Sequence, residues 1–160
     1  MDKPTPWVTI IGLGEDGPDG LPPASLKALQ NAEVIMGAER HLQLLPATDA
    51  KTIQWPVPFS EGIPVLLEQR GNRVVVLASG DPFWHGAGAV LARHLKNGEW
   101  RSLPAPSTMS LAAAHMGWPL EKTMCLGLHA APFERMRPHL AKCQHLIVTL
   151  RDGDAAAQLA

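Results

Sequence analysis

An apolar run that ends in a Gly-Asp-Pro turn constrains the fold of this chain more than any other feature. Residues 73–77 read Arg-Val-Val-Val-Leu, and after two further residues the chain continues as Gly80-Asp81-Pro82. Such a β-branched run is typical of a strand buried on both faces of a parallel sheet. A helical pattern begins after Gly86, so the turn lies at the carboxyl edge of that sheet, where ligands of open α/β sheets bind. Gly, Asp and Pro are also common turn residues, and an ordinary β-to-α connection is the alternative interpretation.

Strand and helix patterns alternate along the chain, which predicts an α/β fold with an open, mostly parallel sheet and helices on both faces. Pro22-Pro23 lies where a helix would begin, because the fixed backbone angle of proline suits a first helical turn. Ser60 is the expected N-cap of a later helix. The expected strands are residues 7–11, 33–37, 52–55, 73–77 and 100–103. One expected helix begins at Pro22-Pro23, and the others cover residues 38–45, 60–70, 86–97 and 107–116.

The sequence Gly117-Trp118-Pro119 interrupts this alternation, and we place a domain boundary there, between residues 1–117 and 118–160. The second stretch does not complete a layered structure, so we expect the sequence to stop within a second domain. The chain should then fold but lack catalysis, because one wall of its cleft would be missing. A frayed terminal tail is the alternative. The expected elements are strands at 123–128 and 145–150, a helix at 132–141, and a helix start capped by Asp154.

Composition and charge exclude several classes of protein. Of the 160 residues, 46% are hydrophobic and 18% are charged, which is typical of a folded chain with a sizeable core. The formal net charge of −1 and the lack of a basic cluster argue against nucleic acid as a partner. No apolar run approaches the ~20 residues that span a bilayer, and the N-terminus does not read as a secretory signal. Cys125 and Cys143 make no disulfide framework, so we expect a cytoplasmic protein.

Two further segments also combine a strand end with a turn of small residues. Residues 7–18 are an apolar run that ends in a glycine-rich loop, and residues 103–114 are a strand end that leads into a helix of small residues. In this order and spacing, the three segments resemble the tetrapyrrole (corrin and porphyrin) methyltransferase family, from Trp7 to the last residue. The Gly14-Glu15-Asp16-Gly17 form of the first loop is most similar to the precorrin-6Y C5,15-methyltransferase branch of that family.

This resemblance implies a function as well as a fold. It implies an enzyme that transfers a methyl group from S-adenosylmethionine to a precorrin, a tetrapyrrole, at C5 in cobalamin biosynthesis, with S-adenosylhomocysteine as product. It also implies a homodimer, and a separate domain or subunit for the C15 methylation and the decarboxylation. Two alternatives stay open: another tetrapyrrole methylase that acts at a different ring carbon, and a module that binds cofactor or tetrapyrrole without turnover.

The resemblance also implies where the cofactor binds. Backbone turns suit methyl transfer, because most of its rate comes from positioning the reactants. Two loops depart from the usual family pattern. Glu15 and Asp16 replace a Pro-Gly pair, and Ala105 replaces a glycine, which would cost about 1 kcal/mol at a positive backbone angle. Asp81 could instead only cap the turn that follows it. The expected cofactor-binding residues are Gly12, Gly14, Glu15, Gly80, Asp81, Pro82, Trp84, Ser107, Thr108 and Leu150.

Asp81 and two histidines supply the other candidates for chemistry. Asp81 and His85 are the candidates for a catalytic role. Because imidazole titrates near neutrality, His85 is a candidate general base, and a hydrogen-bonded residue in the wall of the cleft is the alternative. The precorrin-6Y branch usually has Ser-Leu-His-Gly-Arg around His129. The histidine is retained here and is a candidate for substrate binding, whereas the Gly and Arg are not.

A set of cysteines and histidines has the side-chain chemistry of zinc ligands. Its members are Cys125, His129, His139 and Cys143. No pair among them has the close Cys-x2-Cys spacing that is usual in zinc sites, and cysteine is often simply a core residue. We therefore expect no metal.

Overall fold

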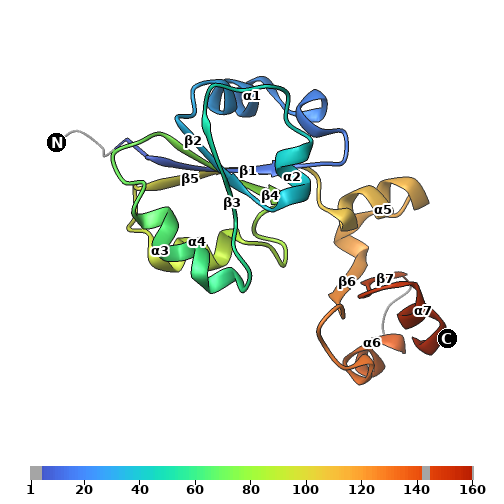
Figure 1. The fold of residues 1–160 in the computed structure, drawn as a ribbon. Helices are drawn as coiled ribbons and strands as arrows, with labels where there is room; N and C mark the ends of the chain where they lie inside the picture. Colours follow the sequence, from blue (N-terminus) through green and yellow to red (C-terminus); the bar gives the residue numbers. More distant parts are fainter. Residues whose placement is uncertain (1–4, 142–144, 160) are drawn as a thin grey trace. The chain divides into compact units, whose positions relative to one another are not determined.

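Five parallel strands form the sheet of the first of two compact units into which the chain folds (Figure 1). The computed structural model describes residues 5–141 and 145–159, and the two units comprise residues 1–106 and 107–160. The strand order is β3-β2-β4-β1-β5, with every neighbouring pair parallel. The predicted fold class, an open parallel α/β sheet, is confirmed. The strands are β1 (Val8–Leu13), β2 (Val34–Gly37), β3 (Lys51–Gln54), β4 (Val74–Ser79) and β5 (Trp100–Leu103).

The apolar run forms β4 at the centre of this sheet, as the sequence predicts. All residues of β4 except Ser79 are buried. Because successive side chains of a strand point to opposite faces, Val74 and Val76 pack on one face and Val75 and Leu77 on the other. Helices α3 and α4 cover the first face, and α1 and α2 cover the second (Figure 1). The helices are α1 (Pro23–Gln30), α2 (Glu39–Gln43), α3 (Gly62–Leu67) and α4 (Gly88–His94), with a 3-10 turn η1 (Gly17–Gly20) before α1.

The helix expected at residues 60–70 begins differently from the prediction, and Ser60 is not its N-cap. A 3-10 turn, η2 (Phe59–Glu61), precedes α3, and no side chain caps either element. The Nε1–H of Trp55 donates to the Phe59 carbonyl at 2.9 Å, and the two rings stack with centroids 4.7 Å apart. These contacts hold the chain in a tight turn through Ser60, so the α-helix begins only at Gly62.

The second unit contains a parallel pair of strands, β6 (Thr123–Gly127) and β7 (His145–Thr149). Helix α5 (Thr108–Met116) belongs to this unit and ends at Gly117, whose φ of 66° is typical of a helix C-cap. The second unit therefore begins before α5, whereas the predicted domain boundary lies after this helix, at Gly117. Its other elements are η3 (Leu120–Lys122), η4 (Phe133–Met136), α6 (Arg137–Leu140) and α7 (Gly153–Leu159).

Asp152, rather than Asp154, caps the last helix. Its Oδ1 accepts the N–H of Ala155 at 2.9 Å, three residues further on. This is the geometry of an N-cap, which satisfies a backbone donor of the first helical turn. Asp154 lies inside α7, so the predicted cap was wrong.

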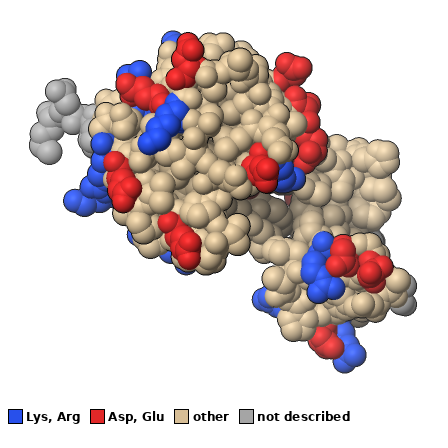
Figure 2. Space-filling view, viewed as in Figure 1, with Lys and Arg blue, Asp and Glu red and all other residues tan. Residues whose placement is uncertain are grey.

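Exposed residues of the chain include charged side chains of both signs. Figure 2 shows acidic and basic side chains interspersed on the face in view, with large uncharged areas between them. Within residues 5–141 and 145–159, no helix is both long and apolar enough to cross a membrane.

Candidate functional site

The carboxyl ends of β1, β4 and β5 meet at one edge of the sheet, where backbone hydrogen bonds join the loops that follow them. In the parallel register, Leu13 lies beside Ser79 at the ends of β1 and β4. The N–H of Gly80 donates to the Leu13 carbonyl at 3.0 Å, and the N–H of Ala105 donates to the Gly80 carbonyl at 3.1 Å. The edge at which ligands of such sheets bind is therefore built largely from backbone.

Gly12 allows these loops to approach one another. A Cβ at this position would lie 1.8 Å from the Gly80 carbonyl oxygen and 2.5 Å from the Ala105 nitrogen. Both are backbone atoms, which cannot move aside as a flexible side chain can. Gly80 has a φ of 53°, in the left-handed region that favours glycine. The structure thus brings Gly12 and Gly80, two of the predicted site residues, into direct contact.

The Gly80-Asp81-Pro82 segment forms a compact turn. Asp81 Oδ1 accepts the N–H of Phe83 at 2.9 Å, so Asp81 does cap the turn, and its other carboxylate oxygen takes no part in that bond. Pro82 is fully buried, and its carbonyl accepts the N–H of Gly88 at 2.8 Å. The turn is therefore fixed to the first residue of α4.

Aromatic side chains are exposed beside this turn. Phe83 is 44% exposed and Trp84 is 42% exposed. The Phe83 ring stacks on Trp100 at 5.5 Å, and the Trp84 ring meets His85 edge-on at 5.4 Å. Among the residues that the structure describes, His85 is the one non-glycine with a positive φ, 51°. Such a conformation is uncommon outside glycine. The predicted residues Asp81, Pro82, Trp84 and His85 are thus gathered in one turn, with Trp84 and His85 exposed.

The first loop accommodates its departures from the family pattern. The N–H of Gly17 donates to the Gly14 carbonyl at 3.1 Å, and Gly17 takes the left-handed conformation, with a φ of 59°. Glu15, Asp16 and Ala105 all lie outside that region of backbone angles, so a side chain at these positions causes no left-handed strain. The predicted cost of about 1 kcal/mol at a lost glycine does not arise here.

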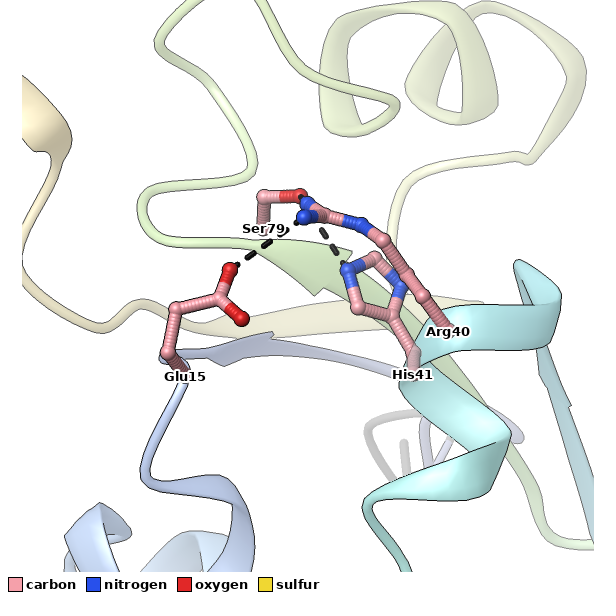
Figure 3. Close-up of polar contacts among 4 residues, drawn as sticks. All are labelled: Glu15, Arg40, His41 and Ser79. Atoms are coloured by element: carbon pink, nitrogen blue, oxygen red, sulfur yellow. Dashed lines mark hydrogen bonds and ion pairs between the residues drawn. The ribbon is translucent and has the colours of Figure 1, made fainter.

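Three side chains that the sequence analysis did not single out gather at the same edge (Figure 3). Arg40 and His41 lie in α2, which follows β2, and Ser79 is the last residue of β4. Arg40 Nη2 donates to Ser79 Oγ, and His41 Nε2 lies 3.1 Å from the same oxygen. Glu15 joins them, because its carboxylate pairs with Arg40 Nη1 at 3.2 Å. Arg40 and His41 could have been predicted from their place in the sequence, because they follow the end of a strand and such residues lie at the ligand-binding edge.

His41 is buried within this group. The residue is 6% exposed, and its Nδ1 atom is buried with no hydrogen-bond partner among the described residues. Burial lowers the pKa of His41 below its usual 6.5, the positive charge of Arg40 lowers this pKa further, and Glu15 raises it. The net direction is downward, so the ring is neutral at neutral pH.

The remaining predicted residues lie in the second unit. Ser107 is the N-cap of α5, because its Oγ accepts the N–H of Ser110 at 3.1 Å. Thr108 is the first residue of that helix, and Leu150 is half-buried directly after β7. His129 is exposed, two residues after β6. The structure places these residues within the second unit, and their role in cofactor or substrate binding stays a prediction.

The cysteine and histidine set forms no described metal centre. Cys143 lies outside the residues that the structure describes. Within 5–141 and 145–159, no three His, Cys, Asp or Glu residues are grouped so that they could hold a metal ion. Burial raises the pKa of the Cys125 thiol, which disfavours the thiolate form that binds zinc.

A cavity of about 380 Å³ lies at the opposite end of the sheet from these loops. It is bordered by residues at the amino ends of β1 and β4, by α1, and by Arg101 of β5. None of the predicted site residues lines it, so it is separate from the edge at which the loops converge.

Comparison with known proteins identifies similar sequences and folds. The tetrapyrrole (corrin/porphyrin) methylases match as a family over residues 8–160. A decarboxylating precorrin-6Y C(5,15)-methyltransferase of Sinorhizobium sp is 39% identical over 157 residues, which cover 98% of this chain and 38% of that protein. A cobalt-precorrin-7 C(5)-methyltransferase of Salmonella typhimurium is 28% identical over 134 residues, covering 82% of this chain and 67% of that protein.

A solved structure is similar in fold. The crystal structure of a cobalamin-biosynthesis precorrin-6Y methylase from Archaeoglobus fulgidus matches with a TM-score of 0.66 and 26% identity, covering 88% of this chain and 71% of that one. The chain spans well under half the length of the Sinorhizobium relative.

Proposed function

The chain belongs to the tetrapyrrole (corrin/porphyrin) methylase family, and from this premise we propose that it serves the S-adenosylmethionine-dependent methylation of a precorrin at C5 in cobalamin biosynthesis. The observation that carries the proposal is the junction of Gly12, Gly80 and Ala105 at the carboxyl edge of the sheet. A junction held by backbone hydrogen bonds is rigid, and methyl transfer depends chiefly on rigid positioning of the reactants.

The residues of this edge fit the chemistry of the cofactor. S-adenosylmethionine carries a cationic ammonium group and a cationic sulfonium group beside an apolar adenosine. The second carboxylate oxygen of Asp81 suits the ammonium group. The exposed ring of Trp84 suits a cation or an apolar surface. Gly12, Gly14, Glu15, Gly80 and Pro82 contribute the surrounding loops in this proposal, and Ser107, Thr108 and Leu150 remain candidate cofactor contacts.

With the exception of His85, the side chains named here bind and orient rather than react. When bound, S-adenosylmethionine supplies an electrophilic methyl group on a positively charged sulfur. Asp81 holds negative charge beside the cationic part of the cofactor, and the exposed rings of Phe83 and Trp84 exclude water from it. His85 remains a candidate base that takes a proton from the substrate. His129 remains a candidate contact to the tetrapyrrole.

The names of the relatives include activities of whole proteins, and this chain covers only part of those proteins. The Sinorhizobium relative is named for methylation at C5 and C15 and for decarboxylation, and the chain covers 38% of it. We assign the C15 methylation and the decarboxylation to a separate domain or subunit, and the second unit, residues 107–160, to a second methylase domain. A homodimer in the cytoplasm completes the proposal.

A cobalt-containing substrate is the second candidate. The Salmonella relative is named for a cobalt-precorrin and for C5 alone, which matches the activity proposed here. The two candidates are separated by offering the cobalt-free and the cobalt-containing precorrin to a longer polypeptide that carries the whole second domain. Mass spectrometry then shows which substrate gains one methyl group.

Calorimetric titration of the chain with S-adenosylhomocysteine tests the cofactor site. Gly80→Val combined with Asp81→Ala should abolish binding, because valine does not adopt a φ of 53° and blocks approach to the backbone. Asp81→Asn alone should weaken binding about 10-fold, the worth of a charge-assisted hydrogen bond.

Gly71→Val is the matched control. Gly71 has a φ of 96° and no atom within 4 Å of its would-be Cβ, and it precedes β4 at the end opposite Gly80. This variant introduces similar backbone strain without touching the site, so it should bind as the wild type does. Equal affinity of wild type and the double variant, with both folded by circular dichroism, would contradict the assignment.

A further inference from the structure

The Arg40 group, formed by Glu15, Arg40, His41 and Ser79, presents hydrogen-bond donors at the carboxyl edge of the sheet (Figure 3). The Arg40 side chain is 58% exposed, and Ser79 is exposed at the end of a strand that is otherwise buried. The guanidinium is a planar fork of N–H donors that matches the geometry of a carboxylate. The N–H donors of Arg40 and the hydroxyl of Ser79 are therefore accessible to a ligand.

The positions of the protons in this group follow from the burial of His41. A neutral imidazole carries its proton on one nitrogen only. A proton on Nδ1 would leave a buried N–H without an acceptor among the described residues, and orphaned buried N–H groups are rarer than orphaned acceptors. The proton therefore lies on Nε2, which donates to Ser79 Oγ at 3.1 Å.

This arrangement leaves the hydroxyl hydrogen of Ser79 available for a further partner. Ser79 Oγ accepts from His41 Nε2 and also from Arg40 Nη2. A hydroxyl oxygen has two lone pairs and one hydrogen, so both lone pairs are then used. The O–H is then available to an acceptor that lies beside the guanidinium, so Arg40 and Ser79 can donate to the same ligand group.

Glu15 indicates the chemistry of the ligand. Its carboxylate already pairs with Arg40 at 3.2 Å, from a side chain that is 88% exposed on the first loop. Exposed ion pairs are weak, because solvent screens them and ordering two long side chains has an entropic cost. A carboxylate that contacts both Arg40 and Ser79 can therefore replace Glu15.

We propose that Arg40 and Ser79 bind a side-chain carboxylate of the tetrapyrrole, with His41 as the residue that positions the Ser79 hydroxyl and Glu15 as the group that the substrate displaces. This inference rests on the proposed function, since precorrins carry acetate and propionate side chains. The cofactor also carries a carboxylate, and the experiment separates the two sources.

Titration of the chain with two corrinoids tests this site. One is cobyrinic acid, with free acetate and propionate groups, and the other is a corrinoid in which these groups are amides. Arg40→Gln should weaken binding of the acid about 10-fold or more, and Ser79→Ala about 3-fold to 10-fold, with little change for the amide. Glu15→Gln should strengthen binding of the acid about 2-fold to 5-fold, because it removes the competing carboxylate.

The positioning role of His41 has its own readout. His41→Leu should reduce affinity for the acid but not for the amide, and His41→Gln, whose amide N–H can reach Ser79, should restore part of it. Arg93→Gln is the matched control, because Arg93 is an exposed arginine on α4. It should change affinity for the acid less than 2-fold.

The outcomes separate this inference from the proposed function. Wild type that fails to bind S-adenosylhomocysteine would count against the proposed function. Wild type that binds it, while Arg40→Gln and Glu15→Gln leave affinity for cobyrinic acid unchanged, would overturn the carboxylate site alone. A loss of S-adenosylhomocysteine affinity in Arg40→Gln, without a loss for the corrinoid acid, would also overturn it, because the carboxylate would then belong to the cofactor.

Discussion

Replacing Gly12 with alanine tests whether the loops at the carboxyl edge are joined as closely as the structure indicates. The added Cβ would lie 1.8 Å from the Gly80 carbonyl oxygen and 2.5 Å from the Ala105 nitrogen. Both distances are far below van der Waals contact, and both partners are backbone atoms. The loops after β4 and β5 must therefore move away from β1.

The expected cost follows from two effects. Overpacking of a close-packed region costs about 1–3 kcal/mol. Moving Gly80 away from Ala105 also breaks or strains their 3.1 Å hydrogen bond, which adds about 1 kcal/mol. Alanine restricts the unfolded chain and offsets about 0.4–1 kcal/mol of this. We expect the free energy of unfolding of the first unit to fall by about 1–3.6 kcal/mol.

Urea unfolding followed by tryptophan fluorescence measures this loss. Four of the five tryptophans lie in the first unit, and Trp55 is 7% exposed, so the signal reports mainly on that unit. Gly71→Ala is the control. Its φ of 96° should cost about 1 kcal/mol, and nothing lies within 4 Å of the new Cβ. A Gly12→Ala variant that is no less stable than Gly71→Ala would refute the close approach of the three loops.

Two further predictions concern His41 and Ser107. Since the pKa of His41 is lowered on folding from 6.5, the unfolded chain binds more protons below that pH. Stability from His41 is therefore complete above pH 6.5 and is lost as the pH falls through the folded pKa. Urea midpoints measured across this range should fall less steeply in His41→Gln, and identical pH profiles would contradict the buried neutral ring. Ser107→Ala should cost the second unit about 1 kcal/mol by removing the cap of α5, measured by the helical circular dichroism signal at rising temperature. Ser110→Ala keeps the backbone N–H that Ser107 accepts, so it should cost less, and an equal loss in both variants would argue against the cap.

Local sequence patterns are enough to predict the order and type of the elements in the first unit. Residues 74–77 are apolar without alternation, because the strand that they form is buried on both faces, and this pattern alone predicts a central strand. The Gly-Asp-Pro turn was predicted for a similar reason. Gly80 has a φ that favours glycine, so the backbone conformation of the turn is reflected in the residue type at this position.

Helix starts were predicted less well, because short-range contacts between side chains and backbone decide them, and several neighbouring residues could supply such a contact. The sequence predicts Ser60 as an N-cap. Instead, Trp55 hydrogen-bonds to the Phe59 carbonyl, Phe59 begins a 3-10 turn, and the helix begins at Gly62. Asp154 reads as a cap, but Asp152 makes the capping bond. Neighbouring polar residues offer the backbone equivalent bonds, and packing selects between them.

Only the tertiary structure brought together Glu15, Arg40, His41 and Ser79. Their positions in the sequence are up to 64 residues apart, and no local pattern links them. Parallel strands place the residues that follow each strand at one edge of the sheet, so side chains from the ends of β1, β2 and β4 meet there. The strand order that sets these neighbours comes from the packing of whole strands, and a chain read one segment at a time does not contain it.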